Sequence, residues 1–360
     1  MPSKAYFEDL MQGKRTSTFW GVILSSLSVL YGAAVYLRRI FFGLHIFRQK
    51  KISCPVVSVG NLTLGGTGKT PTVIQVAQLL TRNYRKPVVV SRGYGRRDDT
   101  EMIVVSDGRS VLVDAQTGGD EPVMIALKLS GVPVVVGSKR VQAALLALQR
   151  FSPDVVLLDD GFQHVQLKRG LDIVLLDGGN PFGNGKLFPA GILREPIHAL
   201  KRAHAVLITK MDDTVDVSRL KETIRQHTRA RIFTSRQVPV DLIDYRSSDI
   251  KSFAVLRGLK VLAFSGIARP DSFILLLRSL GADIAASFTY PDHYDYQKSD
   301  LATVYQKAAD EMISMIVTTE KDAIRLKKFH AEGVWALRIE QIVMESDEWE
   351  AFILERLKNA

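Results

Sequence analysis

Apolar runs alternate with helical stretches along most of the chain. Short apolar segments, typical of buried strands, recur at intervals, and segments with helical spacing at 71–80, 122–129 and 139–150 lie between several of them. This alternation predicts an α/β fold with a mostly parallel sheet covered by helices on both faces. The expected strands of this first part are 55–59, 87–90, 102–105, 132–136, 155–158, 173–176 and 205–208.

A second, smaller α/β unit is expected in the last third of the chain. Its expected elements are strand 261–264, helix 271–280, strand 284–288, helix 299–312 and strand 316–318. Segments 231–238 and 334–342 flank this unit and are predicted to pair as a two-stranded connector. The predicted division is 1–50 for an N-terminal helix and its basic flank, 51–235 for the first domain, 236–345 for the smaller domain with its connector, and 346–360 for a C-terminal helix.

The N-terminal helix is expected to contact a membrane. No charged residue occurs from Thr16 to Leu37, which is close to the roughly 20 apolar residues that a span requires. A helix here would have an apolar face and a face of small residues, which favours lying in the membrane interface or packing the small face on protein. A plain span and a hydrophobic core helix are the alternatives. The two faces are Trp20, Ile23, Leu24, Leu27, Leu30, Tyr31 and Ala34, and Gly21, Ser25, Ser28 and Gly32.

The composition is that of a folded protein and narrows the choice of partners. Of the 360 residues, 46% are hydrophobic and 24% charged, which argues against a disordered chain. Lys and Arg exceed Asp and Glu by 48 to 38, and the net charge of +10 suits an anionic membrane, a phosphorylated substrate or a nucleic acid. Basic residues are not interleaved with aromatic ones, so we expect no nucleic-acid partner. The single cysteine, Cys54, excludes an intramolecular disulfide and a cysteine-based zinc cluster.

A glycine-rich loop lies between the first predicted strand and a predicted helix. From Gly60 the chain reads Gly-Asn-Leu-Thr-Leu-Gly-Gly-Thr-Gly-Lys-Thr, a variant P-loop in which Thr63 replaces the first glycine of the usual pattern. Such a loop surrounds phosphate oxygens with backbone N–H groups, and its lysine reaches the β- and γ-phosphates. It predicts a P-loop kinase-like, three-layer α/β/α domain. The expected ATP-binding residues are Thr63, Leu64, Gly65, Gly66, Thr67, Gly68, Lys69 and Thr70, with the Thr70 hydroxyl also on Mg²⁺.

Acidic residues elsewhere are candidates for metal binding and for base catalysis. Asp159 and Asp160 follow the predicted strand 155–158, where P-loop folds hold Mg²⁺ or its water ligand. A solvated turn is the alternative, and Asp177 is a competing candidate. Asp120 opens a predicted helix and is either its cap or a base that takes the proton of an acceptor hydroxyl. His293, in the second unit, gains a role only if an acidic residue faces it across a cleft.

Several unusual strings occur in an order that resembles the tetraacyldisaccharide 4'-kinases, the lipid A kinase family. The resemblance extends from the N-terminal helix to near the C-terminus and involves both units. Besides the P-loop at 60–71, the strings are Ser-Arg-Gly-Tyr-Gly at 91–95, Gly-Asp-Glu-Pro at 119–122, Leu-Asp-Asp-Gly-Phe-Gln-His at 158–164, Leu-Arg-Glu-Pro at 193–196, Asp-His-Tyr at 292–294 and Thr-Thr-Glu-Lys-Asp at 318–322.

The resemblance implies a lipid kinase that uses ATP and Mg²⁺. Its acceptor would be the 4'-hydroxyl of a tetraacylated glucosamine disaccharide 1-phosphate, a late intermediate of lipid A biosynthesis. The enzyme would lie on the cytoplasmic face of the inner membrane, attached through its N-terminal helix, with no obligate protein partner. The implied site residues are Asp120 as general base, His293 as its partner in a dyad across an interdomain cleft, Lys69 on the phosphates, Asp160 and Glu195 (with Asp159 as alternative) beside Mg²⁺, and Arg92, Gln163, His164 and Arg194 toward the substrate.

A membrane-associated GTPase or ATPase switch is the competing function. Thr-Lys-Met-Asp at 209–212 follows a predicted strand and is similar to the T-K-x-D element with which G proteins read guanine. Lys210 and Asp212 are also interpretable as ordinary solvated loop residues. We favour that interpretation, because a switch would leave Asp120, His293 and Glu195 without a role.

Overall fold

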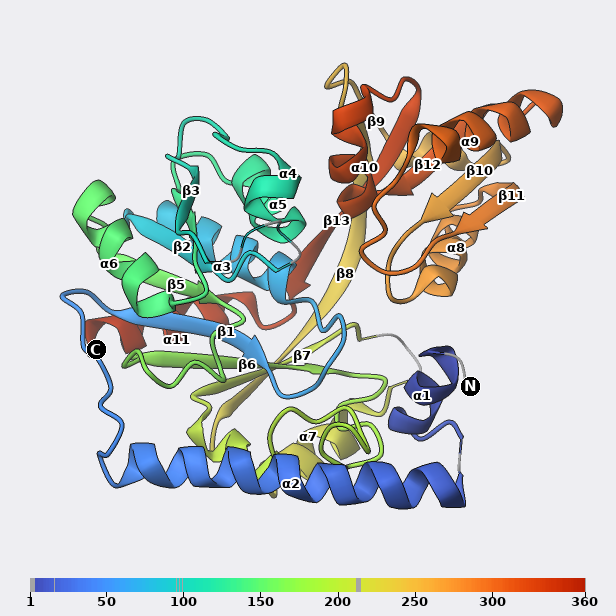
Figure 1. The fold of residues 1–360 in the computed structure, drawn as a ribbon. Coiled ribbons are helices and arrows are strands. Elements are labelled where there is room, and N and C mark those ends of the chain that lie inside the picture. Colours follow the sequence, from blue (N-terminus) through green and yellow to red (C-terminus); the bar gives the residue numbers. More distant parts are fainter. Residues whose placement is uncertain are drawn as a thin grey trace.

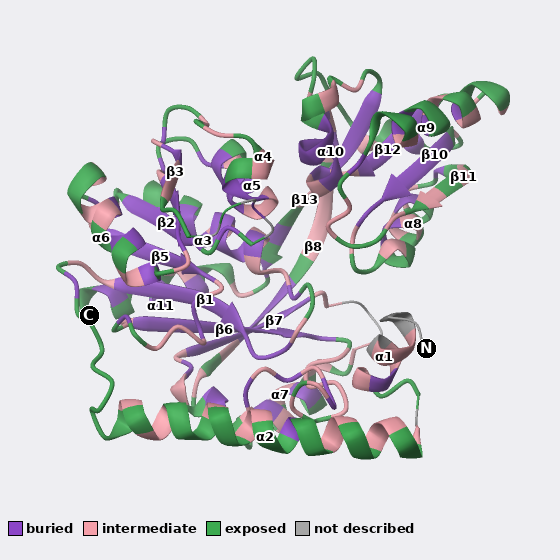
Figure 2. Ribbon diagram, in the orientation of Figure 1, coloured by how far each residue is buried: buried purple, intermediate pink, exposed green. Residues whose placement is uncertain are grey.

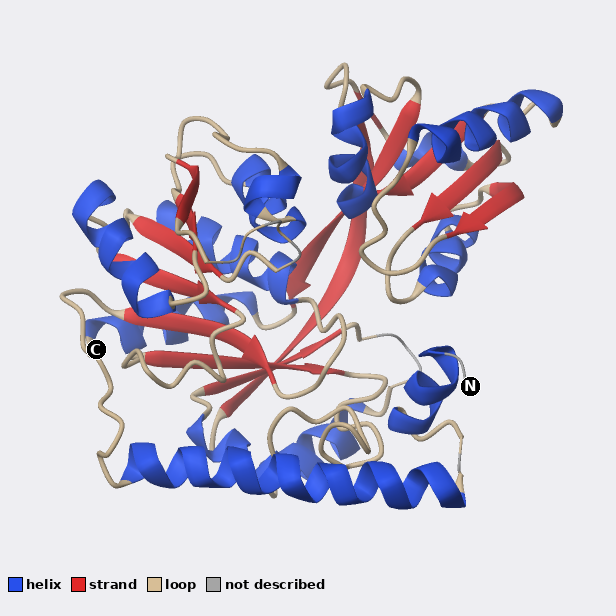
Figure 3. Cartoon of the chain, viewed as in Figure 1, coloured by secondary structure: helices blue, strands red, loops and turns tan. Residues whose placement is uncertain are grey.

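The computed structural model describes residues 4–15, 17–94, 96, 98, 100–211 and 215–359 (Figures 1 and 3). The strands are β1 (Val56–Asn61), β2 (Pro87–Ser91), β3 (Ile103–Ser106), β4 (Val134–Val136), β5 (Val155–Asp159), β6 (Leu171–Asp177), β7 (Ala205–Thr209), β8 (Arg231–Asp244), β9 (Ile250–Lys251), β10 (Lys260–Ser265), β11 (Asp283–Thr289), β12 (Met315–Thr319) and β13 (Val334–Val343). The α-helices are α1 (Lys4–Met11), α2 (Thr18–Gly43), α3 (Lys69–Arg82), α4 (Ala115–Gly118), α5 (Asp120–Lys128), α6 (Arg140–Phe151), α7 (Val217–Arg225), α8 (Pro270–Ser279), α9 (Lys298–Asp310), α10 (Glu320–Leu326) and α11 (Ser346–Lys358). The 3₁₀ helices are η1 (Ile197–Arg202), η2 (Phe253–Leu256) and η3 (Lys327–Phe329).

One continuous sheet runs through the protein. Its strand order is β11-β10-β12-β13-β8-β7-β6-β1-β5-β2-β4-β3, and β9 pairs with β8. Neighbouring strands are parallel except where β3 meets β4 and where β8 meets β13 and β9. Near the centre, Ser58 of β1 lies opposite Leu158 of β5 and Asp172 of β6. The mostly parallel α/β fold expected from the alternating apolar runs is therefore confirmed.

Helices cover both faces of the first half of this sheet. On one face α3, α5 and α11 share a core with the strands, and Trp349 of α11 donates a hydrogen bond of 3.1 Å to Gln75 of α3. On the other face α6, η1 and α7 pack on the strands. Because both faces are covered, β1, β5 and β6 are buried along their whole length, which explains their uninterrupted apolar runs. The three-layer arrangement places the ends of these strands beside the glycine-rich loop.

The long strand β8 links the two halves of the molecule. Its beginning pairs with β7 up to Thr234, and from Ser235 onward it pairs antiparallel with β13. The two segments expected as a connector, 231–238 and 334–342, thus pair with each other over part of their length, and the strands extend beyond the predicted ends. The predicted domain boundary at 235 lies at this change of partner. In Figure 1, β8 and β13 cross the space between the halves.

Helix α2 lies along the outside of the first half, and many of its residues are exposed (Figures 1 and 2). The exposed side chains include Phe19, Val22 and Leu30, so an apolar side faces outward. The helix is long and apolar enough to cross a membrane, and 6% of its most apolar stretch is buried. Its small-residue face packs on protein, because Ser28 donates to Leu187 O over 2.9 Å and Gly32 approaches the Leu187 side chain. Tyr31 was expected on the apolar face. That placement is wrong, since its hydroxyl donates to Arg194 O within the protein.

Candidate functional site

The glycine-rich loop joins β1 to α3 in the way that a P-loop requires. Gly65 and Gly68 have φ values of 102° and 83°, a conformation that costs glycine little and other residues more. Lys69 and Thr70 form the first turn of α3, so the positive end of the helix faces the loop. Thr63, the departure from the usual pattern, is buried and bridges to Leu193. It therefore lies before the part of the loop that can surround phosphates.

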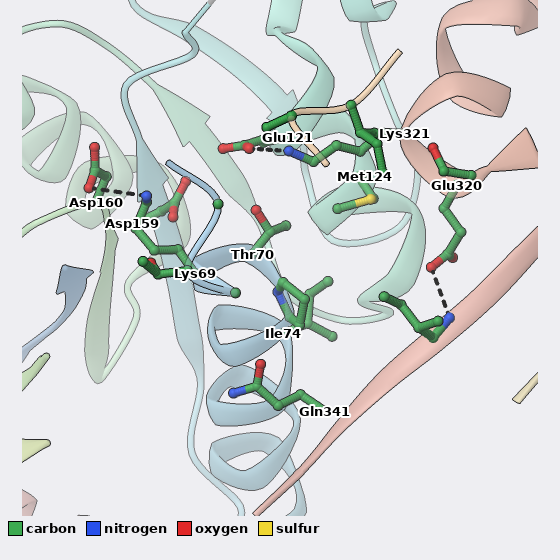
Figure 4. Close-up of a pocket in the computed structure, with 18 of the residues that line it drawn as sticks. Lys69, Thr70, Ile74, Glu121, Met124, Asp159, Asp160, Glu320, Lys321 and Gln341 are labelled. Carbon is green, nitrogen blue, oxygen red and sulfur yellow. Dashed lines mark hydrogen bonds and ion pairs between the residues drawn. The ribbon is translucent and has the colours of Figure 1, made fainter. Parts of the chain in front are cut away.

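A cavity of about 1810 Å³ opens in front of this loop, with walls from both halves of the protein. Figure 4 shows Lys69 beside Asp159 and Asp160, Lys321 reaching Glu121, and Gln341 of β13 against α3, where it donates to Thr72. Of the site residues expected from the sequence, those that line the cavity are Leu64, Gly65, Gly66, Thr67, Gly68, Lys69, Thr70, Arg92, Asp159, Asp160, Gln163, His164, Arg194 and His293. Thr63, Asp120 and Glu195 do not line it.

Asp160 lies between two basic residues at the end of β5. Its carboxylate oxygens each accept a hydrogen bond of 2.9 Å from Arg194 NH1, and Lys69 Nζ is 3.7 Å from Oδ1. Burial alone would raise the pKa of Asp160, but Lys69 and Arg194 outweigh it and hold the pKa below its ordinary value. The backbone φ of 51° turns Asp160 out of the strand direction. Asp160 is thus an ionised acid directly beside the P-loop lysine.

Asp159 differs from its neighbour in both environment and partners. Its Oδ2 accepts from Ser91 Oγ over 2.8 Å, and its buried Oδ1 has no hydrogen-bond partner. Burial, together with the charges of Glu121 and Asp160, raises the pKa of Asp159 to about 6. A buried carboxylate oxygen without a partner is costly unless a cation or a water molecule completes it. The donor set of Asp159, Asp160 and the Thr70 hydroxyl therefore fits Mg²⁺, which prefers oxygen ligands.

Glu195 is buried and already has a cationic partner. Arg202 of η1 donates to both carboxylate oxygens, over 2.8 and 3.0 Å, and its guanidinium lies 4.4 Å from the centre of the Phe162 ring. Arg202 therefore compensates the negative charge of Glu195, and Glu195 does not line the cavity. The assignment of Glu195 to Mg²⁺ therefore remains a prediction that would require Arg202 to yield an oxygen.

Basic and amide side chains gather at the end of the cavity beyond Asp160. Arg140 is 7% exposed, and its Nε has no hydrogen-bond partner. Burial and the charge of Arg92 lower the pKa of Arg140, and the charges of Asp160 and Asp159 offset this only in part. Gln163 Nε2 donates to Asn61 O over 2.9 Å, so Gln163 is tied to the end of β1. An anionic group of a ligand would give the Arg140 guanidinium the hydrogen-bond partner that its Nε lacks.

Asp120 and His293 come from different halves and meet beside the cavity. Asp120 opens α5, and its Oδ2 is 3.3 Å from Nδ1 of His293, which lies in the loop between β11 and α9. The acidic partner across a cleft, on which a role for His293 depended, is therefore present. Gly119 occupies the N-cap position of α5 and Asp120 is the first residue of the helix, so the alternative interpretation of Asp120 as the helix cap is not supported.

Three residues of this region were not foreseen from the sequence as functional. Arg325 of α10 donates from Nε to Asp120 Oδ2 over 2.7 Å, and Lys321 of the same helix donates to Glu121 Oε1 over 2.5 Å. Glu121 and Lys321 line the cavity. The string at 318–322 was noticed without a role for its members. Its position at the start of a short helix, facing the acids at 119–122, is set by tertiary packing alone.

Lys210 corrects the interpretation of the 209–212 string. The interpretation of Lys210 as a solvated loop residue is wrong, because its Nζ donates to Gly66 O and lies 3.3 Å from Asp177 Oδ2. Thr209 also donates to Thr67 O over 2.8 Å. The segment is therefore part of the support of the P-loop. Asp212 lies outside the described residues.

The comparisons with known proteins agree with this geometry. A family model described as LpxK, tetraacyldisaccharide-1-P 4'-kinase, matches residues 20–358. A tetraacyldisaccharide 4'-kinase of Syntrophus aciditrophicus is 40% identical over 98% of this chain and 97% of its own length, and one of Geobacter metallireducens is 41% identical over 84% and 88%. A solved structure described as the "apo" form of LpxK from Aquifex aeolicus in complex with ATP is 30% identical, with a TM-score of 0.77, over 94% of this chain and 99% of that one.

Proposed function

Because the chain belongs to the tetraacyldisaccharide-1-P 4'-kinase family, we propose that it transfers the γ-phosphoryl group of ATP to the 4'-hydroxyl of a tetraacylated glucosamine disaccharide 1-phosphate. The observation that carries this proposal is the meeting of Asp120 and His293 from different halves beside a cavity that begins at the P-loop. A phosphate-binding loop and a base on opposite sides of one cavity suit transfer between two bound substrates.

ATP occupies the P-loop end of the cavity in this proposal. Backbone N–H groups between Gly65 and Thr70 bind its phosphates, and Lys69 offsets the charge that develops on the γ-phosphoryl group. Mg²⁺, held by Thr70 and Asp160, with Asp159 or Glu195 as further ligands, would supply charge neutralisation for the β- and γ-phosphates. Lys210 and Asp177 fix the loop from the side.

The acceptor sugar enters from the end of the cavity that faces α2. Asp120 takes the proton of the attacking 4'-hydroxyl, and His293 orients and polarises Asp120. Arg92, Gln163, His164 and Arg194 contact the disaccharide. The partner-free Nε of buried Arg140 supports a phosphate group at this end, since a guanidinium binds phosphate through paired N–H donors.

The N-terminal helix would hold the enzyme at the cytoplasmic face of the inner membrane. The exposed side chains of α2 include Phe19, Val22, Leu27, Leu30 and Leu37. A helix that packs one face on protein along its length and exposes apolar residues on the other suits a position in the interface. The acyl chains of the substrate could then stay in the bilayer while the sugar reaches the cavity.

A phosphotransfer assay with three variants tests the proposal. The protein in detergent, Mg²⁺ and γ-labelled ATP are incubated with and without tetraacyldisaccharide 1-phosphate. We expect label on the lipid, its loss in Asp120→Ala, and its retention in Asp107→Ala, a matched change at a surface turn. Glu121→Gln separates the two neighbouring acids. Loss of turnover in Glu121→Gln together with normal turnover in Asp120→Ala would move the base to Glu121.

GTP provides the contrast with a nucleotide switch. The contact of Lys210 with Gly66 O is the observation that keeps this alternative, because it places the T-K-x-D-like string at a nucleotide site. Hydrolysis of GTP in preference to ATP, with no labelled lipid, would contradict the kinase and favour the switch.

A further inference from the structure

Arg325 connects the two halves of the protein at the proposed base. Its side chain is 6% exposed, and its Nε donates to Asp120 Oδ2 over 2.7 Å. On the other side, its NH1 donates to Asp322 Oδ1 and to Gly266 O, each over 3.0 Å. Asp322 is in turn fixed by Thr319, whose hydroxyl donates to Oδ2 over 2.6 Å. The guanidinium is therefore held in one orientation by its own half of the protein.

The remaining nitrogen of this guanidinium meets His293. Arg325 NH2 lies 3.2 Å from His293 Nδ1, and the same Nδ1 lies 3.3 Å from Asp120 Oδ2. A guanidinium has only donors, so this contact is a hydrogen bond only when Nδ1 carries no proton. A carboxylate has only acceptors, so Asp120 bonds to Nδ1 only when Nδ1 is protonated. Arg325 and an ionised Asp120 therefore compete for one ring nitrogen.

Asp120 is fixed chiefly by Arg325. Its Oδ2 accepts from Arg325 Nε over 2.7 Å, whereas Nδ1 of His293 is 3.2 Å from Arg325 and 3.3 Å from Asp120. A charge-assisted hydrogen bond between a guanidinium and a carboxylate is among the stronger ones in proteins. Removal of Arg325 would therefore leave Asp120 without its cationic partner and without its shortest contact to the other half.

We propose that Arg325 is a positioning residue that holds Asp120 in place against His293 and keeps Asp120 ionised for proton abstraction. The proposal rests on the proposed kinase function and extends it to a residue from the opposite half. The proposal also makes proton abstraction depend on contact between the two halves, because Asp120 of α5 reaches Arg325 of α10 only when these helices are in contact. Separation of the halves would leave the Asp120–His293 pair broken and the base in water.

The charges around Asp120 support the direction of this effect. Burial alone would raise the pKa of Asp120, but His293 and Arg325 outweigh it and lower the pKa. The other charged or titratable groups facing the pair are Glu121 on α5, Lys321 and Asp322 on α10, Asp292 beside His293, and Tyr94, whose ring meets the edge of the His293 ring. Glu121 and Lys321 pair with each other, and Asp322 pairs with Arg325. Arg325 is therefore the cation that directly contacts both members of the pair.

The pH dependence of kcat/KM for lipid phosphorylation tests the proposal. Removal of a cation within hydrogen-bond distance raises a carboxyl pKa by about 1 to 3 units, so Arg325→Met should move the acid limb upward by about one pH unit or more. Arg325→Lys keeps the positive charge but lacks the several N–H donors of the guanidinium. This variant should keep the acid limb near its original pH and lower kcat, because Asp120 is then less well positioned. Lys128→Met is the matched control, because it breaks another ion pair between α5 and α10, with Glu320, away from Asp120. An unmoved limb in Arg325→Met, or an equal shift in Lys128→Met, would overturn the proposal.

The product assay on the unmodified protein separates this proposal from the proposed function. Absence of labelled lipid with the unmodified protein would contradict the kinase function alone. Labelled lipid, together with an acid limb that stays unmoved in Arg325→Met, would contradict the role of Arg325.

Discussion

The hydroxyl of Tyr31 donates a hydrogen bond of 2.9 Å to the carbonyl oxygen of Arg194. The side chain of that same Arg194 holds both carboxylate oxygens of Asp160. A few residues later on α2, Arg38 NH2 donates to Gln163 O over 3.2 Å. The helix expected to meet the membrane thus contacts the backbone of the two loops that surround Asp160. It supports the site in addition to any role as an anchor.

Replacing Tyr31 with phenylalanine should therefore weaken catalysis without detaching the helix. The change removes one hydrogen bond, worth about 0.5–1.5 kcal/mol, so we expect kcat/KM for the lipid to fall by a factor of about 2 to 10. Tyr84→Phe, the same change at a fully solvated turn, should behave as the wild type. Equal kinetics for Tyr31→Phe and the wild type would show that α2 does not influence the Arg194 loop.

Replacing Lys69 with alanine should abolish most turnover. Lys69 is the only P-loop side chain able to place a positive charge on the γ-phosphoryl group, and it also pairs with Asp160. Loss of one group that stabilises transition-state charge typically lowers kcat by about 10²- to 10³-fold. Single-turnover kinetics at saturating ATP would measure this loss apart from nucleotide binding. A change confined to KM for ATP would contradict a role in the chemical step.

Local sequence pattern was sufficient for the buried strands and for the P-loop, but it did not predict the short helices α7 and α10. Buried parallel strands need uninterrupted apolar runs, and a loop that wraps phosphates needs glycines and a lysine at fixed spacing, so both leave a local signal. The prediction that Tyr31 lies on the apolar face of α2 was wrong because a hydrophobic pattern does not show hydrogen bonds. The Tyr31 ring is apolar, but its hydroxyl finds a partner inside the protein, and a hydrophobic pattern weighs only the ring.

Contacts between the halves left no such signal. Arg325 and Lys321 read in sequence as the ordinary basic residues of a short helix. Their roles arise only because β8 and β13 place α10 against α5. The pairing of Glu195 with Arg202 lies within one half and was missed for another reason, because sequence proximity does not show which cation a buried acid pairs with.

His164 should make the protein less stable in acid. Burial, together with Arg140 and two other arginines, lowers the pKa of His164 to about 4, whereas an unfolded histidine titrates near about 6.5. Between these values the unfolded chain binds a proton that the folded protein does not. The free energy of unfolding therefore falls as pH falls through this window and is unaffected by this group above it.

His164→Gln removes this proton uptake by the unfolded state. Urea denaturation at pH 7 and at pH 4.5 should show that the variant loses about 1–2 kcal/mol less stability than the wild type, after allowance for solvent screening. The control is His330→Asn at an exposed position with φ of 52°, which asparagine tolerates. An identical pH dependence for His164→Gln and wild type would contradict a buried neutral imidazole.

The outward face of α2 should set membrane affinity independently of catalysis. Leu27 and Leu30 are 48% and 67% exposed, and neither contributes to the contacts with Leu187 and Arg194. Burying a leucine side chain in the interface is worth about 1.5–3 kcal/mol, so each change to serine should lower the partition coefficient onto anionic vesicles by about 10- to 150-fold. Leu275→Ser, at a 63% exposed position on α8, is the matched control and should partition as the wild type. Flotation with vesicles measures binding, and turnover of detergent-dispersed lipid should remain close to normal in Leu27→Ser and Leu30→Ser. Unchanged flotation of these two variants would contradict attachment through this face, because the apolar surface would then be buried against something other than lipid.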